Sequence, residues 1–178
     1  MDIGILHSCI QAVCPIVGVS VGDPADKATW RVDFADTATD TQKAAAVAAV
    51  AAYNPDAPTS EQVDAERNRR LLTVTFNTKV YQFCDDQGSE VNITGAGSLA
   101  SVAIMSGAQP GNLRWYDANI DFAWIAADNS LVTMDAQTML AFAKAAADWK
   151  AKHIWAARVL KSTSPIPSDY ATNPIYWP

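Results

Sequence analysis

The sequence predicts an α+β protein made of short antiparallel strands and helices. Polar residues alternate with the apolar side chains of Trp30, Val32 and Phe34, the two-residue period of a half-buried strand. Apolar residues then recur at helical spacing from Met139 to Leu160. Turn-forming residues separate the strand-like segments, which is typical of hairpins. We therefore expect small antiparallel strand pairs and one long amphipathic helix near the C-terminus.

The first third of the chain is expected to fold as strand, strand and helix. The β-rich run 16–21 ends in turn-forming residues, and the alternating segment 30–34 follows it as a hairpin partner. Thr39 and Gln42 have the spacing of a capping box at the start of an alanine-rich helix. That helix is expected to end before Pro55, because the residue preceding a proline disfavours the α conformation.

Composition places a linker between this part and the rest of the chain. The segment 54–60 contains two prolines and no large apolar residue. We expect an N-terminal ββα module at 1–55 and an α+β domain at 56–178 that ends in an extended, proline-rich tail.

The middle of the chain is expected to alternate between helices and strands. Thr59 and Gln62 form a second capping-box pattern, and the polar helix after them ends in arginines, which suit the negative end of the helix dipole. We interpret this helix as solvated rather than as a binding patch. The remaining expected elements are one strand or a bent pair at 72–84, a helix from Ser98, a strand at Leu113 and Trp115, and a hairpin of 120–124 with 131–134.

The last helix is expected to begin after Asp135, a plausible N-cap. Lys150 lies off its apolar stripe, so its replacement by alanine is expected to change stability little. His153 lies on the stripe, where a core or interface histidine is the simpler interpretation than a catalytic base. The stripe comprises Met139, Phe142, Ala146, Trp149, His153, Ala156 and Leu160.

Overall composition favours a soluble globular protein. Of the 178 residues, 49% are hydrophobic and 18% are charged, which allows a packed core. The formal net charge of −6 disfavours general nucleic-acid binding, which needs a basic face. Polar residues interrupt the most apolar stretch, 3–21, and no basic segment precedes it, so we expect neither a membrane span nor a signal peptide.

No motif in the sequence predicts catalysis or a cofactor. Cys9, Cys14 and Cys84 form no disulfide framework, and with two histidines they do not match the paired spacing of a structural zinc site. We interpret them as free thiols, with a disulfide involving Cys9 or Cys14 as the alternative. The sequence has no phosphate-binding loop and no nucleophile elbow. We therefore expect a protein that is not an enzyme and has no cofactor.

The candidate functional residues are aromatic and apolar side chains near the C-terminus. Trp155 lies off the apolar stripe of the last helix, at a position suited to an interface. The tail after Lys161 contains four prolines, so no regular secondary structure is expected in it. We expect the tail to pack on the protein's own sheet or on a neighbouring subunit, with Trp177 as the anchor. The predicted interaction residues are Trp155, Tyr170, Ile175, Tyr176 and Trp177.

The order of several sequence blocks resembles a domain family of tailed bacteriophages and prophages. The blocks are 66–72 (ERNRRLL), 92–100 (NITGAGSLA), 122–138 (FAWIAADNSLVTMDAQT), 156–161 (AARVLK) and the terminal Trp177-Pro178. The family occurs in tail-fibre, baseplate and tail-fibre-assembly proteins. It has no assigned activity, so the resemblance implies a location and carries no functional residues.

This resemblance implies a non-enzymatic tail structural protein, either a fibre or baseplate component or an adaptor. The alternative is a tail-fibre assembly chaperone. The implied partners are other tail, fibre or baseplate proteins, with a second copy of the chain as a further candidate, and neither nucleic acid nor membrane. The implied location is the virion tail, with the host cytoplasm during assembly.

Overall fold

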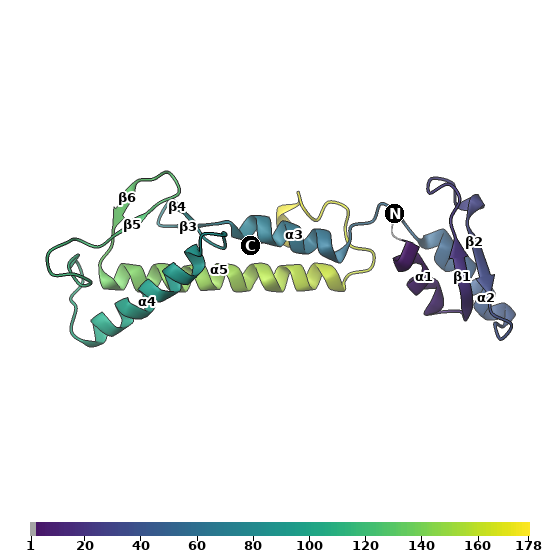
Figure 1. Cartoon of the computed structure of the whole chain (residues 1–178), viewed down its shortest axis with the longest axis horizontal. Helices are drawn as coiled ribbons and strands as arrows, with labels where there is room; N and C mark the ends of the chain where they lie inside the picture. The colour runs from purple at the N-terminus through teal and green to yellow at the C-terminus, as the bar shows by residue number, and fades with distance from the viewer. Residues whose placement is uncertain (1–2) are drawn as a thin grey trace. The chain divides into compact units, whose positions relative to one another are not determined.

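The computed structural model describes residues 3–178, which confirm the α+β class (Figure 1). The chain divides into two compact units, 1–57 and 58–178. This division lies within the proline-containing segment 54–60. Met1 and Asp2, part of the expected N-terminal module, lie outside the described residues.

The N-terminal unit contains the expected hairpin and alanine-rich helix. Strand β1 (Ile16–Ser20) pairs antiparallel with β2 (Arg31–Phe34), and Val19 lies opposite Val32. Helix α2 (Asp40–Ala52) begins at a complete capping box, in which Thr39 accepts from the backbone of Gln42 and Gln42 accepts from that of Thr39. Both elements confirm the sequence pattern. A short 3-10 helix, η1 (Lys27–Thr29), lies in the loop between the strands.

A helix that the sequence reading missed precedes these strands. Helix α1 (Ile3–Gln11) occupies the start of the apolar stretch, and Leu6 and Ile10 are fully buried on it. These two residues are four apart and lie on one helical face, where they pack near Trp30 and Ala46 in the core of this unit. A short apolar run without a capping signal does not distinguish helix from strand, which explains the error.

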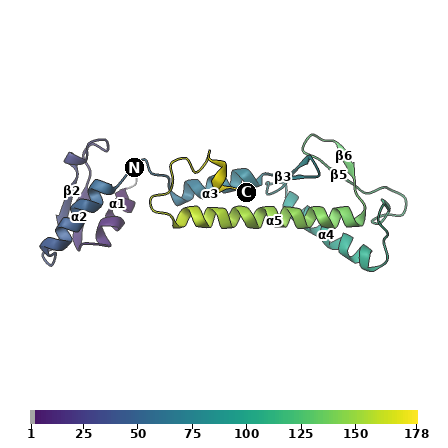
Figure 2. The same cartoon turned by 180° about the vertical axis from the view of Figure 1, so that it is seen from behind.

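The C-terminal unit is organised along one long helix, α5 (Ala136–Ser162), as Figures 1 and 2 show. Helix α4 (Ser89–Met105) packs against the first part of α5, and α3 (Ser60–Leu71) packs against its last part. The tail follows α5 and ends in a short 3-10 helix, η2 (Pro174–Tyr176). The expectation of no regular secondary structure in the tail was therefore wrong for these three residues.

The strands of this unit form separate hairpins instead of one sheet. Strands β3 (Thr73–Phe76) and β4 (Lys79–Gln82) pair with each other, as do β5 (Ala123–Ile125) and β6 (Leu131–Thr133). The segment expected to be one strand or a bent pair is thus a tight hairpin. Asn77 and Thr78 form its turn with positive φ angles of 46° and 66°. Such left-handed geometry at both central residues matches the twist of a two-residue hairpin.

Two further sequence expectations were wrong in this unit. Helix α4 begins at Ser89 and not at Ser98. Its N-cap is Gly88, with a φ of 76°, and the carboxylate of Asp85 accepts from the Ser89 backbone N–H at 2.9 Å. Leu113 and Trp115 do not form a strand. They lie in turns, where the Leu113 carbonyl accepts from the Phe122 N–H and the Trp115 indole donates to the Met134 carbonyl.

Helix α5 confirms the apolar stripe and its Asp135 cap, whose carboxylate accepts from the Thr138 N–H. Ala157 is fully buried and Ala156 only half-buried, so the stripe turns slightly towards α3. Lys150 lies off the stripe, and its ammonium lies 2.6 Å from Glu90 on α4, so an ion pair joins the two helices. The main core around the stripe contains Leu71, Val74, Tyr81, Phe83, Ile93, Ala100, Met134, Met139, Phe142 and Ala146.

A search of residues 3–178 for membrane-spanning helices found none long and apolar enough to cross a bilayer.

Candidate interaction surface

The C-terminal tail docks on α3 and α5 and not on a sheet. Trp177 is 6% exposed and packs with Val63, Ala157 and Leu160 in a small core of its own. The Trp177 indole N–H donates to the Tyr170 carbonyl at 2.7 Å, which closes the tail on itself. Trp177 is thus the anchor of the tail, as expected, but its partner is a pair of helices.

Arg70 of α3 contacts both the backbone and the Trp177 side chain of the docked tail. Its guanidinium donates to the Ala171 carbonyl at 2.9 Å and lies 4.9 Å from the centre of the Trp177 ring. Glu66 accepts from Arg70 at 2.7 Å and fixes the guanidinium in this position. The pKa of Glu66 lies below its ordinary value because Arg69 and Arg70 both donate to its carboxylate.

His153 of α5 lies fully buried under the docked tail. Its ring stacks on Trp177 at a centroid distance of 5.9 Å and contacts Trp149 at 4.2 Å. Nδ1 lies 2.9 Å from the Trp149 carbonyl, and Nε2 has no hydrogen-bond partner within the described part of the chain. Burial holds the pKa of His153 below its ordinary value, so the imidazole is neutral near pH 7. It is a core histidine, which matches the sequence interpretation.

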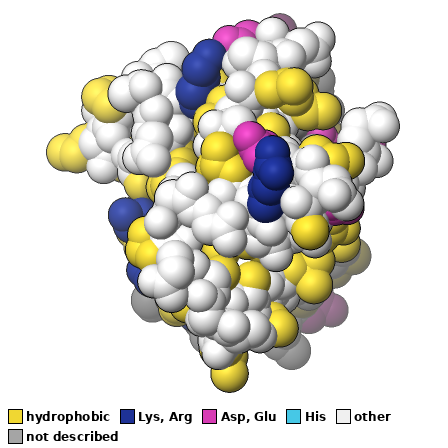
Figure 3. Space-filling view, turned by 90° about the vertical axis from the view of Figure 1, so that its left-hand side faces the viewer, with side chains coloured by type: hydrophobic (Ala, Val, Ile, Leu, Met, Phe, Trp, Pro, Cys, Tyr) yellow, Lys and Arg dark blue, Asp and Glu magenta, His cyan; other side chains and the backbone are white. Residues whose placement is uncertain are grey.

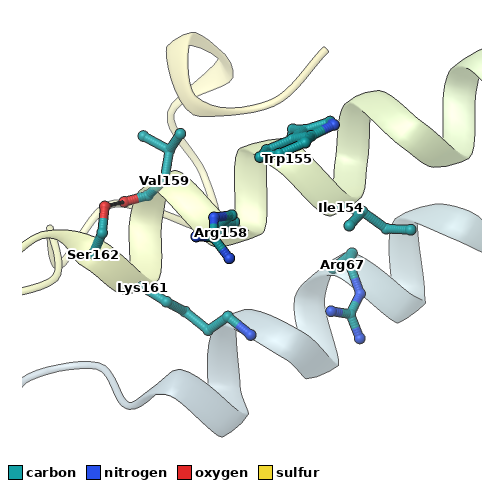
Figure 4. A pocket seen from close by; sticks show the side chains of 7 residues that line it. All are labelled: Arg67, Ile154, Trp155, Arg158, Val159, Lys161 and Ser162. Carbon is teal, nitrogen blue, oxygen red and sulfur yellow. Dashed lines mark hydrogen bonds between the residues drawn. The ribbon is translucent and has the colours of Figure 1, made fainter.

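Beside the tail, α3 and α5 form an open groove of about 680 Å³, which we call the basic groove. Figure 4 shows Lys161 reaching from α5 towards α3, whereas Trp155 and Val159 project from the opposite side of α5. The apolar side chains are well exposed: Trp155 is 64%, Val159 61% and Ile154 44% accessible. The groove is lined by Arg67, Ile154, Trp155, Arg158, Val159, Lys161 and Ser162.

The groove carries excess positive charge within an acidic protein. Arg67 and Lys161 share one carboxylate, Asp64, at 2.6 and 2.7 Å. The hydrogen bond from Lys161, with help from Arg67, lowers the pKa of Asp64, so it stays ionised. Among residues 3–178 no carboxylate pairs with Arg158, whose guanidinium lies 5.8 Å from the centre of the Trp155 ring. Two cations here are thus not neutralised, and one of them lies close to an exposed indole.

The structure divides the predicted interaction residues into two groups. Trp155 is exposed on α5 and lines the basic groove. Ile175 is 79% exposed on the tail. Tyr170 and Tyr176 are half-buried, and Trp177 is buried, so these three residues hold the tail in place.

Sequence reasoning missed the arginines of this surface. The final turns of α3 were interpreted as a solvated helix, yet Arg70 anchors the tail and Arg67 lines the groove. The available signal was the spacing of Glu66 and Arg70, which are four residues apart and do pair. That spacing locates the pair on one face of α3 but says nothing about which segment approaches it.

The other candidate residues of the sequence have local contacts. A search of residues 3–178 for clusters of three or more metal-ligating side chains found none. Cys9, Cys14 and Cys84 are free, as interpreted, and burial together with Glu90 raises the pKa of Cys84 to about 11, which keeps it protonated. Asp85 bonds Ser89, and Asp128 bonds Ser130 and Lys79, so both carboxylates serve local structure.

The fold and this surface define an α+β protein with an aromatic, basic groove and a docked C-terminal tail. Residues 55–172 match a family described as a domain of unknown function (DUF4376), and the chain belongs to this family. No curated protein and no solved structure matches the chain.

Proposed function

We propose that the protein is a non-enzymatic structural component of a bacteriophage tail, part of a fibre or baseplate or an adaptor between them. The observation that supports it best is the exposed Trp155 on the basic groove. An uncovered indole beside cations, on a rigid helix, is the composition of an interface hot spot. The sequence blocks that resemble phage tail domains supply the biological setting.

The proposed partner is another tail, fibre or baseplate protein, and the proposed location is the virion tail. Arg158 and the half-neutralised pair of Arg67 and Lys161 favour an acidic segment with an apolar anchor. Such a segment would place its apolar side chain on Trp155 and Val159 and its carboxylates beside the cations.

Mass spectrometry of purified phage particles tests the location. Peptides of the protein should occur in the particles in a fixed ratio to those of other tail proteins. Abundance in the infected-cell lysate together with absence from particles would contradict the proposal, and would favour the assembly chaperone.

A variant pair tests the groove itself. Trp155→Ala should lower the amount of protein in particles without lowering the melting temperature, because the indole is mostly exposed. Ile125→Ala, which removes a similarly exposed apolar side chain on β5, is the matched control and should be incorporated normally. Equal incorporation of both variants would exclude the groove as the contact.

A further inference from the structure

Helix α4 presents an apolar, uncharged stripe to solvent on the side opposite α5. Val91 is 74%, Val102 60% and Met105 85% exposed, and Leu99, at 51%, lies beside them. The buried face of the same helix already packs Ile93 and its neighbours into the main core. A helix that is apolar on both faces is normally buried on both.

Charge is absent along the whole exposed stripe. After Glu90 the next charged residue is Arg114, so the helix beyond its first turn and the loop after it carry no charge. Figure 3 views the end of the C-terminal unit at which α4 finishes and shows hydrophobic side chains open to solvent, with Lys or Arg and Asp or Glu side chains elsewhere on the same face. An acidic or basic partner would find no complementary charge here, and helices that bind anionic lipid carry lysines or arginines along the polar edge.

The stripe has the spacing of a coiled-coil seam, with small residues in its middle and large residues at its ends. Val91, Gly95, Ser98, Val102 and Met105 follow one another at intervals of four, three, four and three. Gly95 has open space around it, since a methyl group built there meets no atom within 4 Å. A seam with gaps in its middle leaves room for side chains of an opposing helix.

We propose that α4 is a self-association face, and that its occupant is α4 of a second copy of this chain. Two copies placed antiparallel about a two-fold axis level with Ala100 bring Gly95 opposite Met105 of the second copy. The same arrangement brings Ser98 opposite Val102 of the second copy. Val102 and Met105 of each copy then meet a small residue, whereas Val91 lies opposite position 109, beyond the end of α4. The N-terminal end of each helix dipole lies beside the C-terminal end of the other.

An uncharged face limits the repulsion between two copies of an acidic chain. Each copy has a net charge of −6, and contact through this face keeps the like charges of the two copies away from the seam. A helix of 17 residues is about 25 Å long, and one helix pair of this length gives an interface at the small end of the specific range. We therefore expect association in the micromolar range rather than an obligate dimer.

Sedimentation equilibrium of the full chain, from low to high micromolar concentration, tests the proposal. The wild type should approach twice the monomer mass. Val102→Glu should weaken the dimer by at least about tenfold, because an unpaired carboxylate would be buried in the seam. Val47→Glu is the matched control: Val47 is 61% exposed on α2, so the same substitution there should leave the dimer unchanged.

Two results would overturn the proposal. One is a wild type that stays monomeric at every concentration. If that monomer binds phosphatidylcholine vesicles, the occupant of α4 is a lipid surface and not a second copy. The other is a Val102→Glu dimer as stable as the wild type. Both results concern α4 only. They therefore say nothing against the proposed function, which rests on the basic groove.

Disulfide trapping tests whether the two α4 helices meet along this seam. With Cys9 replaced by serine, the double variant Ser98→Cys/Val102→Cys should form a linked dimer on a non-reducing gel after mild oxidation. The control Lys144→Cys/Asp148→Cys, equally spaced and exposed on α5, should stay monomeric. A linked dimer in the control alone, or in neither variant, would contradict the pairing.

Discussion

His153 has no hydrogen-bond partner on one of its ring nitrogens, although it is fully buried. The Trp149 carbonyl can only accept, so Nδ1 carries the proton of the neutral ring and Nε2 is a bare acceptor. Protonation would place a charge beneath Trp177, with the Arg70 guanidinium nearby and no carboxylate bonded to the ring. The neutral ring is thus a condition for the docked tail.

We expect the protein to lose stability as the pH falls below about 6.5, the ordinary pKa of histidine. The folded-state pKa of His153 is lowered, so the unfolded chain binds the proton first and the free energy of unfolding decreases. The slope from this residue is at most about 1.4 kcal/mol per pH unit. Urea unfolding between about pH 7.5 and 5.5 measures it, and His153→Phe should remove most of the slope.

The pKa values of Asp64 and Glu66 are lowered, so these carboxylates do not titrate in the pH range in which His153 affects stability. These carboxylates stabilise the fold above about pH 4, and their contribution is lost only at lower pH. If His153→Phe had the same slope as the wild type between about pH 7.5 and 5.5, the buried imidazole would not be its source.

Trp177→Ala should lower the free energy of unfolding by about 3–5 kcal/mol, because a buried indole leaves a large cavity. Ile175→Ala, two residues earlier on the same tail, should change it by less than about 0.5 kcal/mol, since Ile175 is exposed. Chemical denaturation of both variants measures the difference. Comparable losses would mean that the tail does not dock through Trp177.

At the scale of elements, the contact between α4 and α5 depends on a missing side chain. A methyl group at Gly97 would overlap the Cβ of Ala143 on α5, so glycine permits the close approach of the two helices. Gly95 lies two residues earlier, about 200° around the helix axis, and faces open space. The two glycines of one short sequence block therefore have different roles.

Gly97→Ala should destabilise the protein by about 1–3 kcal/mol, because neither methyl group can rotate away from the other. Gly95→Ala should stabilise it by about 0.5–1 kcal/mol through helix propensity. Both values come from urea unfolding at protein concentrations below the onset of self-association. Effects of the same sign at both positions would contradict the packing of α4 on α5.

At the scale of the whole molecule, the two units have cores that share no residue. The core of the N-terminal unit is built around Leu6, Ile10 and Trp30, and the main core of the C-terminal unit around Tyr81 and Phe142. Each core is assembled from helices and hairpins within its own unit. Each unit therefore has the composition of an independently folding domain.

A chain of residues 58–178 alone should fold and melt at the temperature of the corresponding transition in the full chain. Calorimetry of the full chain should show two transitions, one for each unit. A single cooperative transition, or an unfolded 58–178 fragment, would show that the units stabilise each other.

The sequence by itself determined the elements whose signals are local. Capping boxes at Thr39 and Thr59, the cap at Asp135 and the apolar stripe of α5 depend on residues within one or two turns of each other. The exposed position of Trp155 was also predictable, because it lies off that stripe.

The tertiary structure alone decided how these elements meet. Whether Arg70 faces solvent or the tail depends on a contact with Ala171, which lies far along the chain. The start of α4 and the role of Gly97 depend on Asp85 and on α5 in the same way. Local sequence patterns indicate which helix or strand a segment can form. Burial and pairing between distant segments decide which surfaces stay exposed to solvent. In this protein those surfaces are the basic groove and the outer face of α4.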